Sequence, residues 1–463
     1  MSDIFDLLIV GGGINGVGIA RDAAGRGLKV LLCDKGDLAG ATSSASSKMI
    51  HGGLRYLEHG GFRLVRESLA EREVLLRIAP HLVRPMRFVL PHGPGLRPRW
   101  MLRAGLFLYD RLGGARSVPG SAAVDLRDGP LATPLHDAVT GGFVYSDCVV
   151  DDARLTVANA RDAARHGAEI LSRCELVTAR RDGGLWRVTL RGADDGSERE
   201  AAARILVNVA GPWVPEVLHR AGIASRARLR LDKGSHIVVP RLYAHDHAYL
   251  LQNDDKRVVF VIPFERDYTL IGTTEVAVAA PPAEPPSEAE IAYLCRAVGR
   301  WFKEAPRLED VVWRYSGLRP LYDDGSRSAA ATSRDYVFEL DDSSAPALSV
   351  FGGKLTTYRR LAEAALARLA AHLPGIGPPW TAKSPLPDDD DRAGADDEFG
   401  PGLGRAQVDF LMREEWARTA DDILWRRTKA GLAASPEQRA ALEHYVRNRV
   451  AETFAPVAQT ANR

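Results

Sequence analysis

The spacing of apolar and polar residues divides the chain into three regions. Apolar runs at residues 5–10 and 30–33 flank a helical pattern of small residues over 17–24, which predicts strand, helix and strand. Residues 226–340 show short alternating segments, which predict an antiparallel sheet. Residues 406–432 and 436–454 predict two helices. The chain is therefore expected to be α/β in its first region and α+β overall.

The same patterns predict further elements between these regions. Helices are predicted over 58–79, 154–166, 287–302 and 358–372, and strands over 169–179, 185–190, 205–209 and 349–351.

A glycine-rich turn joins the first predicted strand to the first predicted helix. Gly11, Gly13 and Gly16 fit the spacing G-x-G-x-x-G. Asp34 ends the second strand, close to the roughly 20-residue separation expected of an acid that holds a ribose hydroxyl. The glycines permit a tight turn and close approach of a pyrophosphate, and the helix N-terminus offers N–H groups to it. The turn predicts a dinucleotide site without deciding between NAD and FAD.

Composition narrows the class of protein. A chain of 463 residues has room for two or three domains, and its net charge of +1 argues against a dedicated nucleic-acid binder. The four cysteines form no C-x-x-C, which suits a reducing compartment and predicts neither a metal site nor a disulfide framework. We expect no signal peptide and no membrane-spanning segment, so that any membrane contact is peripheral.

Residues 81–117 are unusually basic. They carry seven arginines against one acid, Asp110, and Trp100 and Phe107 are interleaved with them. Such a helix lies on an anionic membrane with its apolar face down, or packs on the core with a solvated basic side. Composition alone slightly favours the second interpretation.

Two further segments suit a flat ring and an anion beside it. A hydroxyl-rich stretch, 40–48, leads into 49–57, where Gly52 and Gly53 permit close approach of the backbone to a ring. Arg55 follows them and can face a substrate anion. Residues 352–357 precede a predicted helix, whose N-terminus would stabilise negative charge on a reduced ring.

Longer blocks resemble one family. Gly-Gly-Gly-Ile-Asn-Gly at 11–16, Ala-Thr-Ser-Ser-Ala-Ser-Ser-Lys at 41–48 and Ile-His-Gly-Gly-Leu-Arg-Tyr-Leu-Glu at 50–58 resemble the FAD-dependent glycerol-3-phosphate dehydrogenases of aerobic bacteria. Further blocks follow in the same order at 145–155, 233–240, 271–274, 315–321 and 351–359. The resemblance runs from about residue 6 to 379 and resumes near 407.

The resemblance implies an activity and its partners. It implies oxidation of sn-glycerol 3-phosphate to dihydroxyacetone phosphate by hydride transfer to FAD, with electrons passed to membrane quinone. It also implies a cytoplasmic protein attached peripherally to the anionic inner face of the cytoplasmic membrane, and it allows a homodimer. The alternatives are an oxidase that uses oxygen, an amine or amino-acid oxidase on the same scaffold, and a non-catalytic flavin-binding protein.

The resemblance also assigns residues. Cations suited to a phosphate monoester come from distant segments, and His51 is preferred to His236 as the base because it lies in the glycine-rich stretch. The candidate catalytic residues are His51, Arg55, Tyr56, His236, Arg319, Arg334 and Lys354. The candidate FAD-binding residues are Gly11, Gly13, Asn15, Gly16, Asp34, Lys35, Thr42, Ser43, Ser47, Lys48, Gly52, Gly53, Val177, Ala210, Gly211, Gly353, Leu355 and Thr356.

These assignments give a domain plan. A discontinuous Rossmann-like FAD-binding domain is expected over 1–80, 145–225 and 341–379, and an antiparallel-sheet domain that faces substrate and membrane over 81–144 and 226–340. An acidic linker over 380–405 leads to a small helical cap over 406–463. The cap is shorter than the family resemblance leads us to expect, because the acidic linker replaces its first part.

Overall fold

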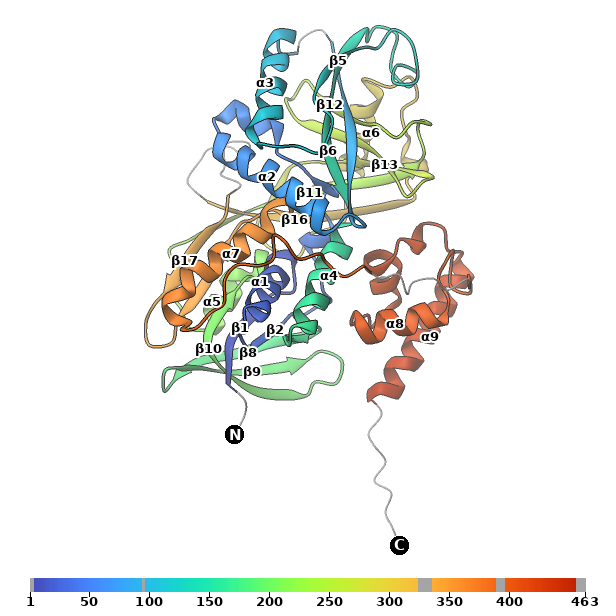
Figure 1. Cartoon of the computed structure of the whole chain (residues 1–463). Coiled ribbons are helices and arrows are strands. Elements are labelled where there is room, and N and C mark those ends of the chain that lie inside the picture. The colour runs from blue at the N-terminus through green and yellow to red at the C-terminus, as the bar shows by residue number, and fades with distance from the viewer. Residues whose placement is uncertain (1–3, 94–95, 324–334, 389–395, 455–463) are drawn as a thin grey trace.

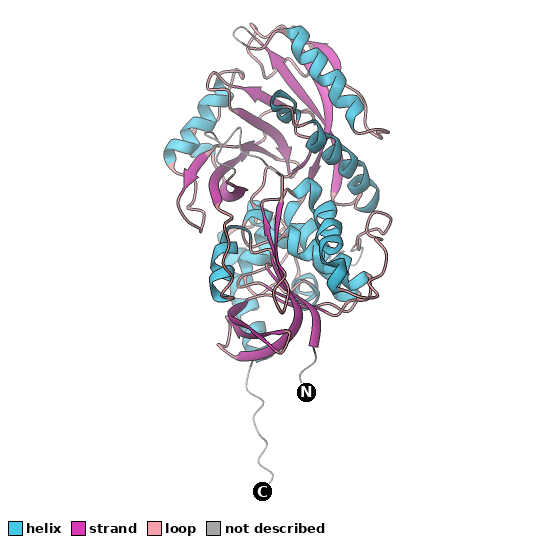
Figure 2. Ribbon diagram, turned by 90° about the vertical axis from the view of Figure 1, so that its left-hand side faces the viewer, coloured by secondary structure: helices cyan, strands magenta, loops and turns pink. Residues whose placement is uncertain are grey.

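Two β-sheets with their covering helices, and a smaller helical unit beside them, make up the protein (Figure 1). The computed structural model describes residues 4–93, 96–323, 335–388 and 396–454. The molecule is elongated along the line that joins the two sheets. The view turned by 90° shows strands in both the upper and the lower part of the molecule (Figure 2).

The first sheet has a parallel centre. Its strands β18, β10, β1, β2 and β7 run parallel in that order, β17 pairs antiparallel at one edge, and the hairpin β8–β9 joins β10. Their bounds are β1 (Ile4–Val10), β2 (Val30–Cys33), β7 (Glu169–Leu171), β8 (Cys174–Asp182), β9 (Leu185–Gly192), β10 (Glu198–Asn208), β17 (Val337–Asp341) and β18 (Ala347–Phe351). Three helices pack on one face: α1 (Ile14–Gly25), α4 (Asp152–Arg165) and α7 (Tyr358–Leu369). The short helix α5 (Val214–Arg220) contacts the other face. The prediction of strand, turn, helix and strand at the N-terminus is therefore confirmed.

The second sheet is mostly antiparallel and positions the other half of the site. It contains β3 (Met49–Ile50), β4 (Val83–His92), β5 (Ala122–Asp125), β6 (Gly141–Val150), β11 (Leu229–Pro240), β12 (Ala248–Gln252), β13 (Val258–Phe264), β14 (Tyr268–Gly272), β15 (Val276–Val278) and β16 (Trp313–Tyr322). Its one parallel pair among the described residues is β4 with β12. Helix α6 (Glu288–Gly299) covers one face, and α2 (Phe62–Ile78) with α3 (Arg99–Leu112) covers the other. Short helical turns complete this part of the chain: Thr42–Ser44, Leu54–His59, Gly211–Trp213, Leu308–Asp310, Leu355–Thr357 and Ala370–His372.

Two predicted elements are interrupted in the structure. The strand expected over 169–179 is split into β7 and β8 because Arg173 has a left-handed φ of 52°. The helix expected over 406–432 is also wrong, since α8 (Arg405–Glu414) ends early and Trp416 has a φ of 57°. A π-helix, η8 (Asp422–Arg427), and a short turn, η9 (Ala430–Leu432), follow before α9 (Pro436–Phe454).

The predicted domain boundaries cut two strands. The boundary at residue 145 falls inside β6, which belongs entirely to the second sheet, and the boundary at 341 falls inside β17, which belongs to the first. Part of the acidic linker lies outside the described residues. The helical unit over 396–454 has an apolar core of its own, formed by residues such as Phe399, Leu411, Ile423 and Leu442.

Candidate active site

The glycine turn lies at the carboxyl end of β1 and forms one wall of a cavity of about 420 Å³. Gly11 has a φ of 122°, and a Cβ there would lie 2.5 Å from the Val209 carbonyl oxygen. A Cβ on Gly16 would lie 1.9 Å from the Gly11 carbonyl oxygen. Only glycine therefore fits at both positions, and the turn leaves room for a pyrophosphate above α1.

Polar groups around this turn suit the diphosphate and ribose of a dinucleotide. The Asp34 carboxylate accepts hydrogen bonds from the N–H groups of Gly12, at 2.5 Å, and Gly36, at 2.7 Å. Burial raises the pKa of Asp34, and these two hydrogen bonds oppose the rise. Within the described part of the chain, the buried side-chain oxygen of Asn15 has no hydrogen-bond partner. FAD therefore fits beside this turn, because a polar group of FAD can form a hydrogen bond with the Asn15 side-chain oxygen.

A second cavity of about 970 Å³ continues from the first. The two cavities adjoin each other, since both are lined by Thr42, Ser46, Pro320, Gly353, Lys354 and Leu355. One cofactor can therefore run from the glycine turn to this junction. The described candidate catalytic residues all line the second cavity: His51, Arg55, Tyr56, His236, Arg319 and Lys354. Arg334 lies outside the described residues.

The loop that carries His51 is fixed by residues from distant segments. The Thr356 hydroxyl lies 3.3 Å from the backbone nitrogen of His51 and 3.4 Å from its carbonyl oxygen. Gly53 has a φ of 78° and lies directly against the Tyr56 ring. The ammonium of Lys354 lies 3.9 Å from the centre of that ring. These contacts bring 51–56 and 353–356 together at the junction of the cavities.

The antiparallel pair β11–β16 supplies Arg319 and His236. The Arg319 guanidinium donates to the Thr273 hydroxyl at 3.1 Å, and it passes over Gly234, where a Cβ would lie 2.6 Å from Nη2. The His236 ring is stacked on Tyr315 with 4.9 Å between ring centres, and its Nε2 lies 2.9 Å from the Ser47 hydroxyl. Burial, together with the positive charges of Arg319 and Lys48, holds the pKa of His236 well below its usual value, so this imidazole is neutral near pH 7.

Not every candidate FAD-binding residue lines a cavity. Lys48 is buried, and its ammonium is bonded to Asp152 at 2.7 Å and to the Ser44 carbonyl at 2.9 Å. The Gly52 N–H donates to the Tyr109 hydroxyl at 2.8 Å. Gly16, Lys48, Gly52 and Val177 are absent from both linings, whereas the other described candidates are present: Gly11, Gly13, Asn15, Asp34, Lys35, Thr42, Ser43, Ser47, Gly53, Ala210, Gly211, Gly353, Leu355 and Thr356.

Other residues, which no sequence pattern indicated, also line the two cavities. Asp37, Arg173 and Arg426 line the first cavity, and Thr273 lines the second. No motif or spacing in the sequence marked these residues as ligand-binding, although Arg426 lies in the segment that resembles the family's cap. Tyr109 and Asp147 fix the Gly52 backbone, because the Tyr109 hydroxyl accepts from the Gly52 N–H and donates to the Asp147 carboxylate, both at 2.8 Å.

Helix α3 forms part of the wall of the second cavity. Its residues Met101, Leu102 and Leu108 line the cavity, while Trp100 and Phe107 are 70% and 54% exposed. Only Leu106 and Tyr109 of this helix are buried. The described helices are all too short or too polar to cross a membrane. Across the same residues, no group of His, Cys, Asp and Glu side chains is placed to hold a metal ion.

Comparisons with known proteins agree with this geometry. Residues 6–359 match the sequence model of the family described as FAD dependent oxidoreductase. The chain is 48% identical to the aerobic glycerol-3-phosphate dehydrogenase of Escherichia coli K12, over 95% of this chain and 97% of that protein. It is also 48% identical to the D-erythritol 1-phosphate dehydrogenase of Brucella abortus, over 96% of this chain and 98% of that protein.

Solved structures show the same fold. The glycerol-3-phosphate dehydrogenase of Bacillus halodurans, complexed with FAD, superposes with a TM-score of 0.71 at 22% identity, over 97% of this chain and 95% of that one. The L-α-glycerophosphate oxidase of Mycoplasma pneumoniae, with FAD bound, gives 0.64 at 18% identity, over 83% of this chain and 100% of that one. With its glycine turn, its two joined cavities and these full-length relatives, the chain belongs to the FAD-dependent oxidoreductase family, in the group that includes the aerobic glycerol-3-phosphate dehydrogenases.

Proposed function

We propose that this protein oxidises sn-glycerol 3-phosphate to dihydroxyacetone phosphate and passes the electrons to a membrane quinone. The observation that carries the proposal is the lining of the second cavity. Arg55, Arg319 and Lys354 come from three distant segments and line one cavity, next to its junction with the dinucleotide cavity. A phosphate monoester carries nearly two negative charges, and such a group of cations suits it. FAD, when bound, accepts the hydride.

Each side chain then has a defined task. Arg319 presents a planar guanidinium, which suits bidentate contact with phosphate, and Thr273 holds it in place. Lys354 adds a point charge beside Tyr56. We assign removal of the hydroxyl proton to the His51 imidazole, because His51 lines the cavity on a loop that Thr356 holds. His236 is buried with Nε2 against Ser47, which suits a positioning role for the neutral ring.

A longer polyol phosphate is a second candidate substrate. The Brucella abortus relative, named for D-erythritol 1-phosphate, is as similar to this chain as the Escherichia coli one. Both substrates carry a secondary alcohol and a phosphate monoester, so the same cations suit both. Comparing kcat/KM for the two compounds decides between them, and a higher value for D-erythritol 1-phosphate would replace glycerol 3-phosphate in the proposal.

An anaerobic titration tests the reaction. Glycerol 3-phosphate added to the holoenzyme without oxygen should bleach the flavin absorbance, and an unbleached flavin contradicts the proposal. Arg319→Met should raise the substrate KM by about 10- to 100-fold, the loss of a charged hydrogen-bonding group, while FAD stays bound. Arg314→Met is the matched control, because Arg314 is exposed on the same strand and lines neither cavity.

The exposed face of α3 supports peripheral membrane attachment. Trp100 and Phe107 project from a helix that also carries Arg99, Arg103 and Arg111, the combination that binds an anionic bilayer. The second cavity extends beneath this helix and so offers an apolar path for a quinone. We place this face on the inner side of the cytoplasmic membrane, and we retain a homodimer as a further expectation.

Vesicle binding and acceptor rates test this attachment. Trp100→Ala with Phe107→Ala should reduce binding to anionic vesicles and the rate with a quinone analogue, while the anaerobic bleaching is unchanged. Leu308→Ala with Val312→Ala is the control, since these residues are 48% and 49% exposed elsewhere. Equal vesicle binding by both double variants refutes the role of α3. A faster rate with oxygen than with the quinone analogue would favour an oxidase.

A further inference from the structure

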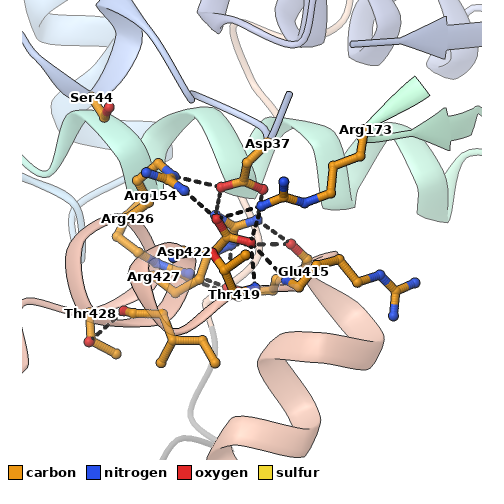
Figure 3. Close-up of polar contacts among 12 residues, drawn as sticks. Asp37, Ser44, Arg154, Arg173, Glu415, Thr419, Asp422, Arg426, Arg427 and Thr428 are labelled. Atoms are coloured by element: carbon orange, nitrogen blue, oxygen red, sulfur yellow. Dashed lines mark hydrogen bonds and ion pairs between the residues drawn. The ribbon is translucent and has the colours of Figure 1, made fainter. Parts of the chain in front are cut away.

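The cap is joined to the FAD-binding region by buried ion pairs (Figure 3). Arg427 of the π-helix η8 is fully buried and donates two hydrogen bonds to the Asp37 carboxylate, both at 2.7 Å. Arg154 of α4 donates to the Glu415 carboxylate of the cap from both terminal nitrogens, Nη1 and Nη2, and Lys429 is bonded to Asp151 at 2.9 Å. The cap is therefore held in one position beside the turn that follows β2.

One cap residue also reaches the cofactor cavity. Arg426 lines the first cavity, donates from Nε to Asp37 at 2.6 Å and forms an ion pair with Asp422 through Nη2. The consecutive residues Arg426 and Arg427 of the π-helix η8 both contact Asp37. Arg427 does so from inside the interface, while Arg426 borders the cavity.

Arg173 faces the same space from the FAD-binding region. Its Nη2 donates to both carboxylate oxygens of Asp422, at 3.0 and 2.9 Å. Its Nε is buried and has no hydrogen-bond partner among the residues that the structure describes. Asp422 thus pairs with two guanidinium groups that line the cavity, Arg173 of the FAD-binding region and Arg426 of its own helix. Because Arg173 lines the first cavity, an acceptor on a bound ligand can complete the hydrogen bonding of this buried donor.

The position along the cavity identifies which part of FAD these groups face. The end shared with the second cavity, at Gly353 and Leu355, is the flavin end. Arg173 lies beside Asp34, the acid expected to hold the adenosine ribose, because the Arg173 N–H donates to the Gly36 carbonyl and the Cys174 N–H to the Asp34 carbonyl, both at 2.7 Å. Arg426 is bonded to Asp37 of the same turn. Both arginines therefore lie at the adenosine end.

We propose that Arg426 of the cap, together with Arg173, binds the adenosine half of FAD, so that the cap forms part of the cofactor site. A guanidinium can donate to ribose hydroxyls or purine nitrogens and can stack on the purine ring. Binding of FAD and docking of the cap then stabilise each other, since linkage between two equilibria is reciprocal. The inference requires FAD but no particular substrate, and its test contains none, so it stands or fails independently of the proposed reaction.

Binding of cofactor fragments to the full-length apoprotein tests the assignment. Arg426→Met should raise the dissociation constants of FAD and of ADP by about tenfold, the effect of losing one hydrogen bond to a charged group. FMN lacks the adenosine half, and its dissociation constant should change less than about twofold. Lys429→Met is the matched control, because it removes a cap ion pair that lies away from both cavities. Its ADP affinity should match that of the unaltered protein.

Two results would overturn the proposal. One is an unchanged ADP affinity in Arg426→Met, and the other is an equal loss in Lys429→Met, which would indicate a general effect of loosening the cap. Hydrogen exchange on the unaltered protein gives a test that needs no variant. Saturating FAD should slow amide exchange in residues 422–432 at least about tenfold relative to the apoprotein, and identical exchange in the two forms refutes the linkage.

Discussion

The Arg427–Asp37 pair gives the sharpest test of how the cap is held. We expect Arg427→Met to loosen the cap. Methionine replaces the apolar stem of the arginine and adds no polar group to the interface. The substitution removes two hydrogen bonds to Asp37 and two to the Glu415 carbonyl oxygen, at 3.1 and 2.6 Å. Among the described residues, the Asp37 side chain, which is 2% exposed, is then paired with Arg426 alone.

The expected loss of free energy follows from the burial of this ion pair. Removing one partner of a buried ion pair costs about 3–5 kcal/mol, and the remaining Arg426 contact places the expected loss near the lower end, about 3 kcal/mol. If the cap opens locally, amide exchange in residues 422–432 should accelerate by about 100-fold. Local exchange is the suitable assay, since a chain with several cores need not unfold in one step.

Two further variants separate this pair from a general defect. Arg413→Met is the control, because its side chain is 67% exposed on the same cap, and its exchange should be unchanged. The double variant Asp37→Leu with Arg427→Met should lose less than the sum of the two single losses, since it leaves no unpaired buried charge. An acceleration below about fivefold in Arg427→Met, or strictly additive losses in the double variant, would refute the reasoning.

Three other predictions concern the cofactor turn, acidic pH and the support of the ring-facing loop. Gly16→Ala should give protein without flavin, because the new Cβ would lie 1.9 Å from the Gly11 carbonyl oxygen, and a full flavin content after purification contradicts this. Burial raises the pKa of Asp422, but the charge of Arg426 and the Arg418 N–H outweigh it and lower the pKa to about 2, below its ordinary 3.8. Its stabilisation of about 2 kcal/mol is complete above about pH 4 and is lost as the pH falls towards 2. The protection of cap amides, measured relative to the intrinsic exchange rate at each pH, should therefore decrease over that range, and constant protection would count against it. Tyr109→Phe removes the hydroxyl that accepts from Gly52 and donates to Asp147, and it should lower the free energy of unfolding by about 1–3 kcal/mol, a loss that an unchanged melting temperature would exclude.

Local patterns in the sequence predicted much of the dinucleotide-binding unit. The predicted strands at 5–10 and 30–33 and the helix predicted from 17 match β1, β2 and the start of α1 to within three residues. This succeeds because glycine spacing, apolar runs and the acid after β2 act within about 30 residues of each other, where chain geometry leaves few alternatives. The predicted helix over 436–454 matches α9 for the same reason.

The contacts between the cap and the dinucleotide-binding unit were decided by the tertiary structure alone. The helix predicted over 406–432 is broken, because Glu415, Asp422 and Arg427 form ion pairs and hydrogen bonds with residues of distant segments. The periodicity of a local segment does not predict such contacts. Arg426 and Asp37 are 389 residues apart, and no local pattern links them. The sequence by itself predicted a dinucleotide site and the glycine turn expected to hold its pyrophosphate. Only the fold decided which distant cations border each end of it, because contacts between remote segments depend on how the two sheets and the cap pack together.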